Sequence, residues 1–68
     1  MTHRDVARVY LEGARNDRKA ASKWIKRVMR DFERAARRFR KQGRHMAAYM
    51  SRNGAEFQRR VLAELRTL

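Results

Sequence analysis

The stretch that decides the fold of this chain is residues 18–42, which read RKAASKWIKRVMRDFERAARRFRKQ. Apolar side chains recur in it every three or four positions, as they do along one face of an α-helix. This apolar line consists of Ala21, Trp24, Ile25, Val28, Phe32, Ala35 and Phe39. The spacing predicts a long amphipathic helix whose apolar line is buried against another part of the protein.

A second line of side chains runs almost opposite the apolar line and is entirely cationic. We call it the cationic stripe; it consists of Lys19, Lys23, Lys26, Arg30, Arg34, Arg37 and Lys41. Folding requires the apolar line but not the stripe, because like charges in a row repel one another. Twelve cationic and only two acidic residues lie between Arg18 and Arg44. Since a solvated helix face normally mixes its charges, we expect the stripe to bind something negative.

Signals for helix ends divide the rest of the chain. Thr2 and Asp5 have the spacing of a capping box, and Gly43 fits the left-handed position that follows a helix. The segment 13–17 interrupts the apolar pattern, either as a true break with Asp17 capping a new helix or as a weak spot in one long helix. The prediction is a helix over about 3–42 with a possible break at 13–17, a turn at 43, and a helix over about 44–67 with a possible kink at 53–54.

The second long segment has an apolar face of its own, made of Met46, Met50, Phe57, Val61, Leu65 and Leu68. At 1.5 Å per residue, 18–42 and 44–67 would be about 37 and 36 Å long, so a turn at Gly43 predicts an antiparallel helical hairpin. Two helices alone leave half of each apolar face wet, and residues 3–12 are the obvious remaining cover, from the same chain or from a neighbour. We therefore expect an all-α fold in one small domain, 1–68, that forms a homodimer with a four-helix arrangement.

The composition narrows the classes of function. The 68 residues include nineteen Lys and Arg against seven Asp and Glu, a formal net charge of +12 that favours nucleic acid, an anionic surface or an acidic protein as partner. There is no cysteine. His3 and His45 have no acidic residue at metal-ligand spacing, and Ser22 and Ser51 have no nucleophile-activating arrangement. We therefore expect no enzyme, no metal and no cofactor, and a soluble, cytoplasmic protein without a membrane span.

Nucleic acid is the favoured target on charge. The stripe would extend about 33 Å, close to one turn of B-DNA, and could meet phosphates along a groove. Few Asn, Gln, Ser or Thr residues share its face, so we expect binding through backbone and shape rather than base recognition. Trp24, Phe32 and Phe39 could stack on bases of a single strand, but their spacing favours the core. A basic amphipathic helix can also lie on a membrane, although the second helix is available to cover its apolar face.

A protein partner is the alternative. Tyr10 and Tyr49, near the edges of their apolar faces, and Arg44 are candidate anchors of a protein interface. The stretch from Trp24 to Met50 resembles, in size, composition and hairpin pattern, small phage-encoded anti-activators of Pseudomonas, helical dimers that bind and disable host regulators, including quorum-sensing transcription factors. The resemblance implies stoichiometric inhibition of a host regulatory protein, whose acidic surface would attract the basic face.

Overall fold

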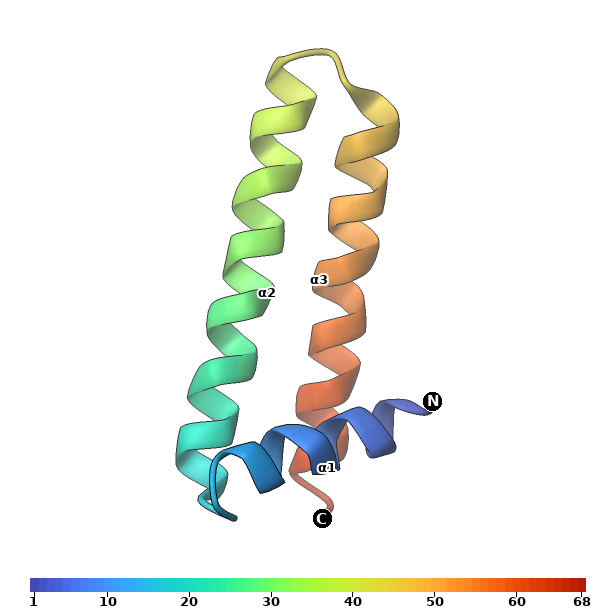
Figure 1. Cartoon of the computed structure of the whole chain (residues 1–68). Helices are drawn as coiled ribbons and strands as arrows, with labels where there is room; N and C mark the ends of the chain where they lie inside the picture. The colour runs from blue at the N-terminus through green and yellow to red at the C-terminus, as the bar shows by residue number, and fades with distance from the viewer.

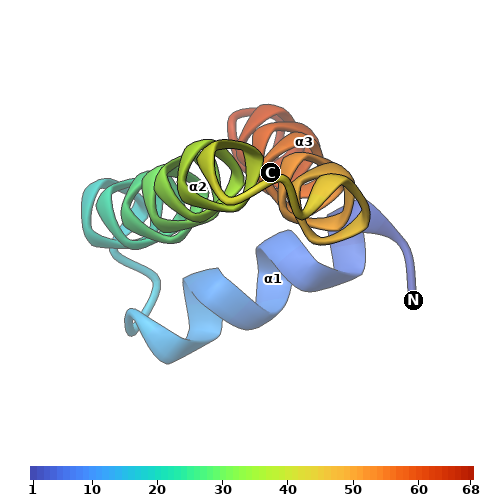
Figure 2. The same ribbon diagram turned by 90° about the horizontal axis from the view of Figure 1, so that it is seen from above.

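The computed structural model of this protein describes residues 1–68 and contains three helices. They are α1 (His3–Gly13), α2 (Arg18–Lys41) and α3 (His45–Leu65). No strand is present, so the prediction of an all-α fold is confirmed. Helices α2 and α3 lie side by side and run in opposite directions, and α1 crosses them at the end where α2 begins (Figure 1). Seen from above, α1 covers one side of the layer that α2 and α3 form (Figure 2).

The first two helices begin at capping residues that the sequence signals. The Thr2 Oγ1 atom accepts from the Asp5 backbone N–H at 3.1 Å, and the Thr2 N–H donates to Asp5 Oδ2 at 3.0 Å, which completes the capping box. At the start of α2, Asp17 Oδ1 accepts from the Ala20 N–H at 3.1 Å. The structure therefore has a true break at 14–17, with Arg15 and Asn16 in the left-handed region at φ of 54° and 63°.

The turn between α2 and α3 follows the expected glycine. Gly43 has a φ of 72°. Its N–H donates to the Arg40 carbonyl at 3.0 Å, and the Arg44 N–H donates to the Phe39 carbonyl at 2.9 Å, the pair of bonds that defines a Schellman motif. The carbonyls of Phe39 and Arg40 are therefore satisfied without a side chain.

Helix α3 is continuous through Asn53 and Gly54, where the sequence pattern allowed a kink. Gly54 has a packing role instead: a Cβ atom there would lie only 2.6 Å from the Phe32 ring. The missing side chain lets the ring of Phe32 pack directly on the backbone of α3.

The hydrophobic core lies at the end of the molecule that α1 covers. It contains six buried residues: Ala7, Ala21, Ile25, Val61, Leu62 and Leu65. Polar contacts hold α1 in place there. Arg4 Nη1 lies 3.3 Å from Glu64 Oε2, and the Tyr10 hydroxyl donates to Gln58 Oε1 at 3.2 Å. The opposite end, near the turn, has only two helices.

The face of α3 that contacts α2 differs from the predicted one. Val61 and Leu65 are buried as expected, but Met46, Met50 and Phe57 are exposed. Five buried positions were not predicted: the small or polar residues Ala48, Ser51, Ala55 and Gln58, and the large apolar residue Leu62. They repeat at intervals of three and four, and small side chains let two helices approach closely. The large apolar residues therefore lie to one side of the contact.

Candidate nucleic-acid interface

The cationic stripe lies on the side of α2 that faces away from the core. The buried residues of this helix are Ala21, Ile25 and Ala36. Most stripe residues lie on the opposite side of the helix axis from them. Six of the seven stripe residues are exposed, and only Lys26 is half-buried. The structure thus leaves the whole stripe accessible along one helix, over about 33 Å.

Almost none of the stripe's charge is neutralised within the chain. Only Arg34 forms an ion pair, with Asp31 three residues before it. The other acidic residue of α2, Glu33, reaches across to Arg59 of α3 at 3.9 Å. The remaining stripe residues have no acidic partner, so an external anion would meet unpaired cations.

Two shallow hollows lie along the outer surface of α2. The first, near the turn, is lined by Arg34, Arg37, Arg38, Lys41 and Gln42 and has a volume of about 470 Å³. Four of its five residues are cationic and none is acidic. Arg38 does not belong to the predicted stripe, but it lies next to the stripe and extends its charge sideways.

The second hollow, which we call the Trp24 hollow, lies toward the start of α2. It is lined by Ala20, Lys23, Trp24, Arg27 and Arg30 and has a volume of about 380 Å³. Trp24 was predicted to be a core residue, and this prediction is wrong: its side chain is 49% exposed. The physical reason is its position at the edge of the apolar line, where α1 covers one side of the indole and leaves the other open.

Helix α1 holds the indole of Trp24 in place. The ring of Tyr10 meets it edge-on, with ring centroids 5.1 Å apart. Gly13 lies next to the indole, where a Cβ atom would be 3.3 Å from Cζ3. Tyr10 is itself fixed by its bond to Gln58, and partial burial raises the pKa of its hydroxyl above the usual value. Tyr10 is therefore half-buried, and its hydroxyl is used within the fold.

The other two candidate anchors lie near the turn. Tyr49 is 61% exposed. Arg44 is exposed as well, and its guanidinium carbon lies 4.9 Å from the centroid of the Phe39 ring, within cation–π distance. Met46 and Met50, 72% and 65% exposed, belong to the same end. We call Met46, Tyr49 and Met50 the turn-end apolar face.

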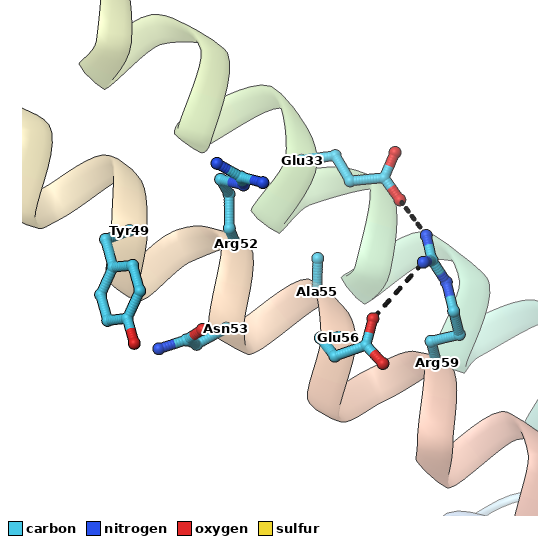
Figure 3. A pocket seen from close by; sticks show the side chains of 7 residues that line it. All are labelled: Glu33, Tyr49, Arg52, Asn53, Ala55, Glu56 and Arg59. Carbon is cyan, nitrogen blue, oxygen red and sulfur yellow. Dashed lines mark hydrogen bonds and ion pairs between the residues drawn. The ribbon is translucent and has the colours of Figure 1, made fainter.

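Tyr49 also lines a hollow of about 480 Å³ on the α2–α3 pair. Figure 3 shows Tyr49 and Asn53 next to one another at one end of it, and ion pairs at the other. There the Arg59 guanidinium lies 3.4 Å from Glu56 and 3.9 Å from Glu33. Both acidic residues of this hollow, Glu33 and Glu56, are paired with Arg59, and Arg52 is its one charged residue without an ion pair, so the hollow has less free charge than the stripe.

No cluster of three or more metal-binding side chains is present, and no helix is both long and apolar enough to pass through a membrane. Comparisons with protein families, with curated proteins and with solved structures gave no significant match. What the chain does must therefore be argued from its own surface.

Sequence analysis missed two cations of this surface, Arg27 and Arg38. Each lies next to the stripe around the helix, so a wider angular window along α2 would have included them. That they line hollows depends on how their side chains lie, which spacing alone does not indicate. Trp24 was considered for base stacking and assigned to the core, because spacing does not show where a covering helix ends.

Proposed function

We propose that this protein binds nucleic acid through the cationic stripe, by contacts with backbone phosphates. The observation that carries the proposal is the row of exposed cations on α2 of which only Arg34 has an acidic partner. Lys and Arg that neutralise phosphates release condensed counterions, which drives binding without regard to sequence. The scarcity of amide and hydroxyl side chains on this face supports backbone recognition over base recognition.

The test is a fluorescence anisotropy titration with labelled random-sequence duplex DNA at several salt concentrations. Binding through phosphates predicts that the logarithm of the association constant falls linearly with the logarithm of salt, by about 0.9 per phosphate neutralised. Tight binding at low salt with such a slope would support the proposal. Weak binding even at low salt would contradict it.

Two matched double variants separate the contribution of the stripe to binding from that of the overall charge of +12. Arg30→Gln with Arg37→Gln removes two stripe charges, and the salt slope should become shallower by about 1.8. Arg8→Gln with Arg66→Gln removes two exposed charges from α1 and from the residue after α3, and should leave the slope nearly unchanged. Equal effects of the two double variants would assign binding to net charge alone.

The stripe would be presented by a homodimer. The chain is elongated, with extents of 40 × 20 × 15 Å, and exposes 5265 Å² where a compact monomer of this size exposes about 4,500 Å². The turn-end apolar face carries part of this excess. A second copy packed there would bury Met46 and Met50 and complete a four-helix arrangement, which keeps the antiparallel α2–α3 hairpin as its unit.

Sedimentation velocity tests the dimer. Met50→Glu should shift the protein toward monomer, whereas Ala63→Glu, at an exposed position away from the turn-end apolar face, should not. Added salt should strengthen the dimer, because two copies of charge +12 repel one another less when screened. This dependence is opposite in sign to that of nucleic-acid binding. A wild-type protein that stays monomeric at all salt concentrations would overturn the dimer.

The second candidate function is the one that the anti-activator resemblance implies: stoichiometric inhibition of a regulatory protein. The specific observation in its favour is the turn-end apolar face, where Tyr49 and two methionines are exposed beside Arg44. Aromatic residues, Met and Arg are the residue types enriched in protein interfaces. This function predicts that one regulator is retained at moderate salt by the wild-type protein and by Ala63→Glu, and is lost with Met50→Glu.

A further inference from the structure

We infer that the Trp24 hollow binds an unpaired base, so that single-stranded nucleic acid is the preferred ligand of the stripe. This inference rests on the proposed function, because the same cations supply the phosphate contacts. The indole provides the flat apolar surface on which any base can stack, and Lys23, Arg27 and Arg30 line the same hollow.

Trp24 is held in position rather than simply exposed. Its indole contacts Tyr10 edge-on at 5.1 Å between centroids, and the Tyr10 hydroxyl is tied to Gln58 of α3 at 3.2 Å. Gly13 leaves room for the ring against α1. An aromatic ring held against α1 by a tyrosine that is itself tied to α3 loses little further freedom when a base stacks on it.

The charged side chains next to the ring are all cationic. The hollow contains three cations and no acidic residue, and two of these cations, Lys23 and Arg30, belong to the stripe. Lys23 and Arg30 are separated by about 10 Å along the helix axis. A strand whose base stacks on Trp24 therefore has a row of cations beside the indole, along the helix axis, for its flanking phosphates.

Stacking on the indole distinguishes single strands from duplexes. In a duplex both faces of each base are occupied by stacking, and extruding one base costs a few kcal/mol. The stripe can contact the phosphates of either form. Only an unpaired base can also use the indole, so the Trp24 hollow adds affinity for single strands alone.

Trp24 is the only tryptophan of the chain, which makes its fluorescence a direct report of the site. The protein is titrated with end-labelled oligothymidylate of about 12 nucleotides, with an abasic strand of equal length and with a duplex. Label anisotropy measures affinity, and tryptophan emission measures stacking. Oligothymidylate should quench the emission, protect the indole from acrylamide, and bind about tenfold more tightly than the abasic strand, which has the same phosphates but no bases.

Trp24→Leu should lower the affinity for oligothymidylate to that for the abasic strand and leave the abasic affinity unchanged. Trp24→Phe, which keeps an aromatic ring against Tyr10, should retain part of the difference in affinity between oligothymidylate and the abasic strand. Circular dichroism checks that both variants keep their helices, and acrylamide protection of the wild-type protein tests stacking without any variant.

The outcomes separate the two proposals. Equal affinity for the thymidylate and abasic strands, without protection of Trp24, overturns base stacking and leaves phosphate binding in place. If no strand binds at low salt, the proposed function fails as well. Polyglutamate that binds as tightly as oligothymidylate and protects Trp24 to the same extent would overturn the assignment of the Trp24 hollow to a base and assign it to an acidic protein.

Discussion

The two ends of the molecule are built by different means. At the end covered by α1, three helices enclose the only large side chains that are fully buried, Ile25 and Val61. At the turn end, α2 and α3 contact one another through small residues such as Ala36 and Ala48, and large apolar side chains remain exposed. Stability is therefore concentrated at one end, and the surface available for interactions at the turn end is not needed for folding.

The largest effect is expected from a cavity at the α1 end. Ile25→Ala removes a fully buried side chain and should lower the free energy of unfolding by about 2–5 kcal/mol, whereas Met50→Ala, at a position 65% exposed, should change it by no more than about 0.5 kcal/mol. Urea denaturation followed by circular dichroism measures both.

A domain of this size has a total stability of only about 3–10 kcal/mol, so Ile25→Ala can unfold it outright. Ile25→Val, with an expected loss of about 0.5–1.5 kcal/mol, keeps the comparison measurable. If Met50→Ala destabilised the chain as much as Ile25→Val, the contrast between the two ends would be wrong.

The second prediction concerns the boundary between the ends, where Phe32 packs on Gly54. A Cβ atom at Gly54 would lie 2.6 Å from the Phe32 ring, so Gly54→Ala should destabilise the protein by about 1–3 kcal/mol although alanine is the better helix former. Thermal or urea denaturation provides the measurement.

In the control, the effect of Gly54→Ala on stability should change sign. In a Phe32→Ala background the ring is gone, and Gly54→Ala should then stabilise the helix by up to about 1 kcal/mol. A Gly54→Ala change that stabilises the wild-type protein would show that the ring moves aside at little cost, and that close packing does not hold the two helices together there.

The parts of this fold that could be predicted from sequence are the local ones. The capping box of Thr2 and Asp5, the cap at Asp17 and the left-handed Gly43 each depend on residues within a few positions of one another. The all-helical character follows from the same short-range spacing. Such signals can be recognised without knowing what lies across the core.

The side of each helix that faces its neighbour could not be predicted in the same way. Trp24, Met46 and Met50 were assigned to the core because they are large and apolar, and all three are exposed. Ser51 and Ala55 are buried instead because small side chains allow the helices to approach closely. For the candidate site, the stripe lies opposite this ambiguous face, so its exposure was predictable, whereas the opening of the Trp24 hollow depends on where α1 stops.

The third prediction tests the cap that separates α1 from α2. Asp17 Oδ1 accepts from the Ala20 N–H, and Asp17→Ala should cost about 1 kcal/mol, whereas Asp17→Asn should retain most of the stability because asparagine caps nearly as well. Denaturation midpoints of the two variants give the comparison. If both cost the same, the charge of Asp17 near the positive end of the helix dipole, rather than its hydrogen bond, would be the stabilising feature.

The smallest expected effect is a decrease in the free energy of unfolding at acid pH that is caused by Asp5, at the α1 end. The Thr2 backbone N–H, followed by its hydroxyl, lowers the pKa of Asp5 below the ordinary value of 3.8. A carboxyl group whose pKa is lower in the folded than in the unfolded state stabilises the folded state at pH values above its unfolded-state pKa. This stabilisation is lost as the pH falls through the folded-state pKa. The free energy of unfolding should therefore decrease less between about pH 5 and pH 2 in Asp5→Asn than in the wild-type protein.

Thr2→Val sharpens this test, because it removes the hydroxyl and keeps the backbone N–H that has the larger influence on the Asp5 pKa. It should lower stability at neutral pH through the lost cap and yet preserve most of the acid dependence. An acid dependence that disappears with Thr2→Val would mean that the hydroxyl, not the backbone, holds the Asp5 carboxylate, and that the capping box acts mainly through its side chains.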